Sequence, residues 1–267
     1  MNSIRAKFVR GEEVKFISHL DLKKVFERAL RRSGILIAYS KGFNPHPQMV
    51  FGLPLSVGVT SESEYIDLEF EEPIDVDNFM DRLNECLPKG IKVVEAKEKK
   101  EKTNIMASIA GASYEILVNS AKIRDSNDIK DMIDKFMDLE EIIIKKETKR
   151  KIKDINIRPM IYSIKAGLCI DGIDEQVNKE ENYCCKNPWI LKYIKTNYED
   201  HIKFKGDLKN SLFCFSTLLS AGSSANLKPV FLVKALNNTF CSDFDVIKIH
   251  RTELFTGSAD KFTNPLD

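Results

Sequence analysis

Several patterns that identify common enzyme classes are missing from this chain of 267 residues. It has no G-x-x-x-x-G-K-[ST] loop, no H-E-x-x-H pair and no G-x-S-x-G elbow, which argues against a P-loop nucleotide site, a zinc protease and an α/β-hydrolase. No apolar run approaches the roughly 18 residues of a membrane-spanning helix. The first ten residues are too highly charged for a secretory signal. We therefore expect a cytoplasmic protein.

The cysteines show no metal-binding spacing. Six occur, at positions 86, 169, 184, 185, 214 and 241, without a C-x-x-C pair or a C-x-x-x-C-x-x-C motif. The adjacent Cys184 and Cys185 are poorly placed to hold one tetrahedral metal. We expect free thiols in a reducing compartment, with no cofactor, no metal and no iron–sulfur cluster.

Net charge is almost absent. Lys and Arg number 41 against 40 Asp and Glu, which leaves a net charge of +1. No overall field attracts the protein to nucleic acid, so any polyanion site must be a local patch. With 43% apolar residues, the chain has material for one large core or two ordinary ones.

The order of apolar and polar residues indicates two successive strand–helix–strand–strand–helix–strand patterns. In the first, Ile4, Ala6 and Phe8 alternate with charged residues and predict a strand, while Ser18 and Gly34 bound an expected helix. The rest of this pattern is a strand at 48–53, a strand at 65–70, a helix at 79–87 and a strand at 91–96.

The second pattern is longer and interrupted. It comprises a strand at 114–118, a helix at 129–137, paired strands at 141–147 and 152–157, a strand at 212–219, a helix at 226–236 and a strand at 246–255. The polar stretch 171–210 lacks periodicity and is interpreted as an insertion with a short helix around 189–198, while the charge run 97–102 is the expected linker. We predict an α+β protein of two tandem ferredoxin-like (βαββαβ) sandwiches, with domains at 1–100 and 108–260 and the inserted polar segment in the second.

His19 occupies the expected start of the first helix, within Phe16-Ile17-Ser18-His19-Leu20-Asp21-Leu22. The positive end of the helix dipole lowers the pKa of a histidine there, and a neutral imidazole can accept a proton or bind a ligand. Ser18 and Asp21 also match a capping box, which explains them without any catalysis. Both interpretations stay open.

His46 lies in the loop Gly42-Phe43-Asn44-Pro45-His46-Pro47. Its flanking prolines restrict the backbone and give a stiff loop, although purely structural loops also use this pattern. We interpret His19 and His46 as a candidate catalytic pair. Lys41 and Asn44 are candidate phosphate contacts.

A basic line is expected along the first helix. Lys24, Arg28 and Arg31 are spaced at i, i+4 and i+7 and therefore fall on one face. Such a line can follow a phosphate backbone, whereas an ordinary solvated helix face, partly neutralised by Glu27, has the same pattern. We predict phosphate contact.

The second half offers further phosphate-binding candidates. Ser223 and Ser224 lead to Asn226, an expected helix cap whose turn presents backbone N–H groups to an anion. Arg158 and Arg251 complete the predicted set. A plain capped loop and structural ion pairing are the alternatives.

These motifs together resemble the radical-SAM-linked protein family, a bacterial domain of unknown function fused to, or encoded beside, cobalamin-binding radical SAM proteins. The resemblance spans about residues 3–165 and 211–255, and also rests on Pro54-Leu55-Ser56-Val57-Gly58, Glu62-Ser63-Glu64-Tyr65, Ile157-Arg158-Pro159, 221–229 and 249–254. It implies a stand-alone companion to a radical SAM enzyme, with the radical chemistry on the partner. The stretch 171–210 departs from the family pattern.

Three functional hypotheses follow. The first is a non-catalytic subunit that binds RNA, or an RNA-containing assembly, and presents it to the radical SAM partner. The second is an RNA-processing or RNA-modifying enzyme with His19 and His46 as its acid–base pair. The third is an assembly module in which the motifs serve folding and docking.

Overall fold

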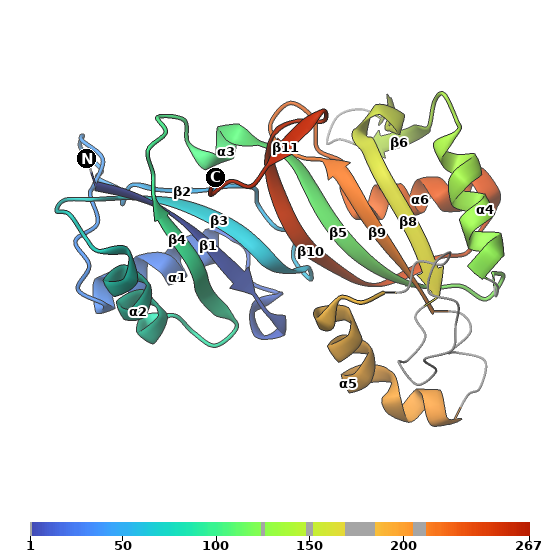
Figure 1. The fold of residues 1–267 in the computed structure, drawn as a ribbon, viewed down its shortest axis with the longest axis horizontal. Coiled ribbons are helices and arrows are strands. Elements are labelled where there is room, and N and C mark those ends of the chain that lie inside the picture. The colour runs from blue at the N-terminus through green and yellow to red at the C-terminus, as the bar shows by residue number, and fades with distance from the viewer. Residues whose placement is uncertain (1, 124–125, 148–151, 169–184, 205–211) are drawn as a thin grey trace. The chain divides into compact units, whose positions relative to one another are not determined.

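The computed structural model describes residues 2–123, 126–147, 152–168, 185–204 and 212–267. The expected α+β class is confirmed, because this part of the chain forms a large, mostly antiparallel sheet and six α-helices (Figure 1). None of the helices in these ranges is both long and apolar enough to cross a membrane.

The chain divides into two compact units. Unit 1 comprises Met1–Ala112, Ala221–Ser224 and Arg251–Asp267, and unit 2 comprises Ser113–Ser220 and Ala225–His250. Two long strands, β5 (Ile109–Asn119) and β10 (Asp245–Ser258), contribute residues to both units.

Unit 1 contains the first predicted succession of elements. They are β1 (Asn2–Arg10), α1 (His19–Arg32), β2 (Met49–Phe51), β3 (Thr60–Phe70), α2 (Val76–Cys86) and β4 (Ile91–Glu98), followed by α3 (Ile105–Ser108) and β11 (Lys261–Thr263). A single 3-10 turn, Glu12–Val14, connects β1 towards α1. The strands run in the order β4-β1-β3, with β2 along β3, and these pairs are antiparallel.

Both long helices of unit 1 cover one face of this sheet (Figure 1). Alternate residues of β1 and β3 point into the core beneath α1 and α2. The aromatic centre is tight, since Phe26 of α1 lies edge-on to Phe8 of β1 at 5.0 Å and to Phe51 of β2 at 5.4 Å. The middle of α1 is therefore packed against the end of β1 and against β2.

Unit 2 is built on the order β10-β5-β9-β8. Its elements besides β5 and β10 are α4 (Ser126–Met137), β6 (Ile143–Glu147), β7 (Ile152–Asn156), a 3-10 turn (Arg158–Met160), β8 (Ile161–Leu168), α5 (Pro188–Phe204), β9 (Leu212–Ser220) and α6 (Pro229–Phe240). Strands β8 and β9 pair antiparallel.

The predicted hairpin at 141–157 is present but forms a separate two-stranded sheet of β6 and β7. One face of the hairpin is covered and the other faces solvent at this point, since Ile144 is buried while Ile143 is 51% exposed. The large sheet uses β8 instead, a strand that the sequence pattern did not indicate, since Ser163 and Gly167 are weak strand formers.

Within the predicted insertion, 171–184 and 205–210 lie outside the described residues. The helix expected around 189–198 is present as the longer α5. Cys86, Cys185, Cys214 and Cys241 form no disulfide, as expected, whereas Cys169 and Cys184 lie outside the described residues.

Candidate functional site

The Ser18 cap at the start of α1 is confirmed, although Asp21 bonds the Ser18 hydroxyl rather than the Ser18 backbone N–H of a full capping box. Ser18 Oγ accepts a hydrogen bond from the Asp21 backbone N–H at 3.2 Å, and the Ser18 hydroxyl donates to Asp21 Oδ2 at 2.7 Å. Asp21 Oδ1 also lies 3.8 Å from Lys24 Nζ. Both side chains of the motif are thus engaged in starting the helix.

His19 is half-buried beside this cap. Its ring meets Phe51 edge-on, with centroids 5.4 Å apart. Burial lowers the pKa of His19, and the positive charges of Lys23 and Arg10 lower it further. The direction agrees with the prediction, but burial is the main cause. The imidazole is therefore neutral at pH 7.

A buried arginine supports the segment that leads to His19. Arg10 is fully buried, and its Nη2 donates to the carbonyl oxygens of Val14 at 3.5 Å and Ile17 at 3.1 Å. Its Nε and Nη1 have no hydrogen-bond partner in the described part of the chain. Burial lowers the pKa of Arg10, while Glu64 opposes this and Arg251 adds to it.

Glu64 is the carboxylate of this buried group. Arg251 Nη1 donates to Glu64 Oε1 at 2.8 Å and to the Leu53 carbonyl oxygen at 3.2 Å, and Arg251 is only 2% exposed. The prediction that Arg251 contacts phosphate is therefore wrong. A guanidinium enclosed by a carboxylate and loop carbonyls cannot reach a polyanion outside.

The sequence contains a signal for this group that we missed. Arg10 continues the buried face formed by Ile4, Ala6 and Phe8, and Glu64 begins the buried face of Ile66 and Leu68. A charge at a core position of a strand predicts a partner of opposite sign inside the protein. This buried group contains two arginines and one glutamate, close to the half-buried His19.

His46 lies in a closed, exposed loop. The Ser40 N–H donates to the His46 carbonyl oxygen at 2.9 Å, and the His46 N–H donates to Ser40 Oγ at 3.0 Å. Tyr39 and Pro47 close the base as an isolated bridge. The loop is thus closed by hydrogen bonds at its base, and its stiffness stays a prediction. No hydrogen bond or ring contact joins the imidazoles of His19 and His46 within the described residues.

The predicted basic line is exposed on α1. The three side chains of this line, Lys24, Arg28 and Arg31, are exposed to solvent. Lys41 and Asn44 are exposed in the His46 loop. Arg28 and Arg31 form no ion pair with any part of the chain that the structure describes.

Exposed apolar side chains accompany these cations. Phe43 is 112% exposed at the tip of the His46 loop, and Phe16, Leu20 and Tyr39 are 73%, 68% and 51% exposed. Together with the cations, these exposed side chains make the surface a candidate for contact with a ligand. The sequence pattern placed Phe16 and Phe43 in the motifs but did not mark them as exposed.

Of two predicted contacts in unit 2, Arg158 has a structural role and Asn226 lacks the helix-capping role that the sequence suggested. Arg158 donates to the Met137 carbonyl oxygen from Nη2 at 2.8 Å and from Nε at 3.1 Å, and to the Ile161 carbonyl oxygen from Nη1 at 3.3 Å. It thereby closes the C-terminal end of α4. Asn226 does not cap α6, because Pro229 fixes the first helical turn and Lys228 is the N-cap residue.

The loop residues Ser223 and Ser224 are exposed, as a phosphate contact requires. Gly222 beside them has φ +121°, and a Cβ there would lie 2.2 Å from the Ile109 carbonyl oxygen. The glycine is thus explained by close backbone packing within unit 1.

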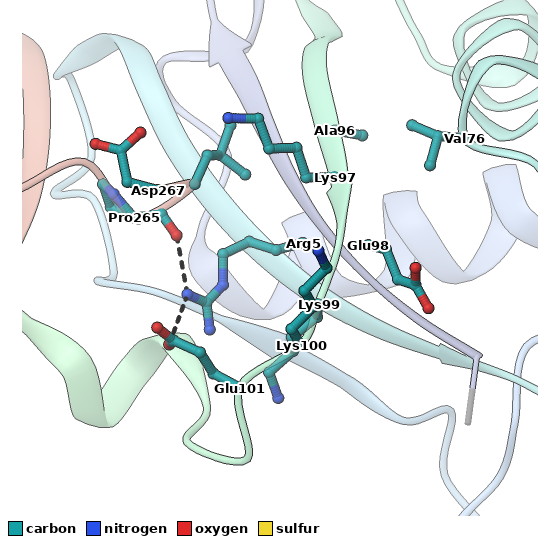
Figure 2. A pocket seen from close by; sticks show the side chains of 11 residues that line it. Arg5, Val76, Ala96, Lys97, Glu98, Lys99, Lys100, Glu101, Pro265 and Asp267 are labelled. Atoms are coloured by element: carbon teal, nitrogen blue, oxygen red, sulfur yellow. Dashed lines mark hydrogen bonds and ion pairs between the residues drawn. The ribbon is translucent and has the colours of Figure 1, made fainter.

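A cavity of about 510 Å³, with several charged residues in its wall, lies elsewhere in unit 1 (Figure 2). Arg5 in its wall donates to Asp67 Oδ1 at 2.7 Å and to the Pro265 carbonyl oxygen at 2.9 Å. Lys99 Nζ lies 3.4 Å from Asp67 Oδ2, so the predicted linker at 97–102 is packed against the unit rather than fully solvated. The charged side chains in the cavity wall therefore mainly bond neighbouring segments of unit 1 to one another.

A second polar cluster surrounds Glu253. Lys7 Nζ donates to Glu253 Oε2 at 2.8 Å, and the Tyr65 hydroxyl and Ser63 hydroxyl both donate to Glu253 Oε1. Burial raises the pKa of Tyr65, and the charge of Glu253 acts in the same direction. Tyr65 is therefore a hydrogen-bond donor here, not a base.

Residues 3–203 match a family described as "Uncharacterized protein conserved in bacteria (DUF2344)". Among solved structures, a chain in the crystal structure of a Cbf5-Nop10-Gar1 complex is 11% identical with a TM-score of 0.46; the match covers 94% of this chain and 48% of that one. An unknown protein from Galdieria sulphuraria is 10% identical with a TM-score of 0.23, covering 92% and 96%. These TM-scores are too low to support a conclusion. No curated protein matches the chain.

Proposed function

Since the chain belongs to a family of uncharacterized proteins conserved in bacteria, we propose a function from the site itself: unit 1 recognises RNA, or an RNA-containing assembly, in the cytoplasm. The contact surface is the exposed face of α1 together with the His46 loop. The observation that carries the proposal is the line of Lys24, Arg28 and Arg31 on one solvent-facing helix surface.

The charges of this line are available to a ligand. Arg28 and Arg31 form no ion pair within the described residues, and Lys24 has only a long, solvent-exposed one to Asp21. Cations in this state exchange water and counterions for phosphates at little desolvation cost, and counterion release favours that exchange. The net charge of +1 for the whole chain makes this a local effect.

The exposed aromatic rings add a second binding mode. Phe43 presents its whole ring to solvent on a loop held closed at its base. Base stacking on an aromatic ring is worth about 1–3 kcal/mol per base and is tolerant of sequence. RNA with unpaired bases is therefore the favoured ligand class.

Two finer statements belong to this proposal. Each unit is a ferredoxin-like sandwich: in order along the chain, the strands β1, β2, β3 and β4 of unit 1 and β5, β8, β9 and β10 of unit 2 correspond to one another, with the β6-β7 hairpin and α5 inserted in unit 2. The partner is a cobalamin-binding radical SAM protein, as the motif resemblance implies. Co-purification of the tagged chain with such a protein tests the partnership.

RNA binding is tested by fluorescence anisotropy with a labelled single-stranded RNA pool. Arg28→Gln with Arg31→Gln removes two charges from α1, and Phe43→Ala removes the exposed ring. We expect each variant to weaken binding by about tenfold or more, because each change removes about 1.4 kcal/mol or more of contact energy.

The matched control is Lys130→Gln with Lys135→Gln, which removes the same charge from exposed positions of α4 in unit 2. It should bind RNA as the wild-type chain does. Equal weakening by both double variants would mean that only total charge matters. Absence of any RNA binding by the wild-type chain, alone or with its partner, would overturn the proposal.

A second candidate is RNA cleavage with His19 as general base. The lowered pKa of His19 favours it, because a neutral imidazole can accept the proton of an attacking hydroxyl. Cleavage of the same RNA pool by wild-type protein, lost on His19→Gln and on His46→Gln, would support this function. An intact pool after prolonged incubation would exclude it for these RNAs.

A further inference from the structure

Three potential metal ligands from separate parts of the chain meet inside unit 2. Glu115 lies on β5, Cys214 on β9, and Cys185 just before α5. Their ligand atoms all lie within 4.8 Å of one another, all three residues are buried, and Cys214 Sγ is 3.0 Å from Glu115 Oε2. Around one tetrahedral zinc, bonds of about 2.0–2.3 Å place neighbouring ligand atoms about 3.5–3.8 Å apart. Small side-chain adjustments bring the three atoms to that spacing.

The surroundings of this cluster are apolar. Leu117, Ile190, Ile194 and Leu212 pack with Cys185 and Cys214 in one buried group. A carboxylate in such a place costs free energy unless a hydrogen-bonded cation or a metal compensates its charge. A divalent ion bound by all three ligands would offset two of their negative charges.

The charges balance once a nearby lysine is included. Two thiolates and one carboxylate carry three negative charges, against two positive charges on the metal. Lys248 is only 4% exposed, and its Nζ lies 5.1 Å from the ring centre of Tyr193, a residue that packs against the same apolar group. One buried ammonium in this region brings the total to zero.

We infer that Glu115, Cys185 and Cys214 form a zinc-binding site. Thiolate ligands select zinc over magnesium, calcium and manganese, which prefer oxygen alone. On binding, each thiol S–H bond breaks, its proton passes to solvent and a Zn–S bond forms, without any change of oxidation state. The three residues leave one of four tetrahedral positions for water or another ligand.

The site ties an inserted element to the sheet. Cys185 immediately precedes α5, whereas Glu115 and Cys214 belong to neighbouring strands, β5 and β9. A metal bound by all three stabilises the docking of α5 on unit 2. The sequence gives no such signal, because the ligands are far apart along the chain and match no zinc motif.

The test uses the full chain, purified with a reductant and without chelators. Zinc is measured by mass spectrometry of the metal, then removed, and Co²⁺ alone is titrated in. We expect about one zinc per chain and a thiolate-to-cobalt charge-transfer band. Cys185→Ser and Cys214→Ser should abolish the band or weaken Co²⁺ binding by more than about tenfold, whereas Cys86→Ser and Cys241→Ser should leave it unchanged.

Glu115→Gln keeps the side-chain size and guards against misfolding as the explanation. It should weaken Co²⁺ binding while the circular dichroism spectrum stays that of the wild type. Three outcomes would overturn the inference: no band in reduced wild-type protein, a band that survives both cysteine variants, or a disulfide between Cys185 and Cys214 in unreduced protein. Unchanged hydrogen exchange of α5 after zinc removal would refute the docking role.

Discussion

At the scale of single residues, the buried guanidinium groups of Arg10 and Arg251 share the neighbourhood of one carboxylate, Glu64. Arg10 and Arg251 are both buried, and Glu64 provides the negative charge close to them. Removing one member of a buried ionic group leaves an uncompensated charge inside the protein. The group therefore supports the segment before His19. Substitutions in it should lower the free energy of unfolding.

Glu64→Gln tests this role. We expect the free energy of unfolding to fall by about 3–5 kcal/mol, since Arg251 then loses its ion pair with Glu64 and Arg10 loses a nearby negative charge. Urea denaturation measures the change, and Glu72→Gln at an exposed position should alter stability by less than about 0.5 kcal/mol. Adding Arg251→Met to Glu64→Gln should restore part of the loss. A Glu64→Gln protein as stable as the wild type would contradict this account.

His19 gives a prediction about pH. Its pKa is lower in the folded than in the unfolded protein, so the unfolded chain binds more protons in the window below the ordinary value of about 6.5. The contribution of His19 to stability is present above that pH and is lost as the pH falls through the folded-state pKa. Unfolding measured between pH 8 and pH 5 should show a shallower decline for His19→Gln than for the wild type. Parallel curves would argue against a perturbed His19.

At the scale of secondary-structure elements, local chemistry made some boundaries predictable and tertiary context decided others. The ends of α1 follow from Ser18 and from Gly34, whose φ of +66° suits glycine. The start of α6 was placed too early because Asn226 is a good cap, whereas Pro229 set the actual first turn. Strand β8 was missed because its burial depends on pairing with β9, a long-range contact that its own residues do not encode.

The loop containing Gly222 tests whether its glycine serves packing. Gly222→Ala places a Cβ against the Ile109 carbonyl oxygen, whereas Gly42→Ala, at φ +137°, meets nothing within 4 Å. Both substitutions place alanine at a positive φ, which costs about 1–3 kcal/mol of backbone strain. Only Gly222→Ala adds overpacking, which costs about 1–3 kcal/mol more. Thermal and urea unfolding should therefore rank Gly222→Ala as clearly less stable than Gly42→Ala. Equal losses would show that backbone conformation alone explains the glycine.

At the scale of the whole molecule, positive and negative charges nearly cancel, but the charged side chains differ in how deeply they are buried. Arginines in the motifs divide into two kinds: Arg251 and Arg158 hold the fold, while Arg28 and Arg31 face solvent. The sequence predicted the exposed line from helical spacing alone. It did not separate exposed from buried arginines on strands and turns, because burial there depends on which segments cover them.

The central claim is that the exposed line on α1 contacts phosphates, and the salt dependence of RNA affinity tests it most directly. Each phosphate contact to single-stranded nucleic acid contributes about 0.7 to the slope of log K against log salt concentration, so Arg28→Gln with Arg31→Gln should reduce that slope by about 1.4. Lys130→Gln with Lys135→Gln should leave it unchanged. Identical slopes for the wild type and the α1 variant would contradict the account.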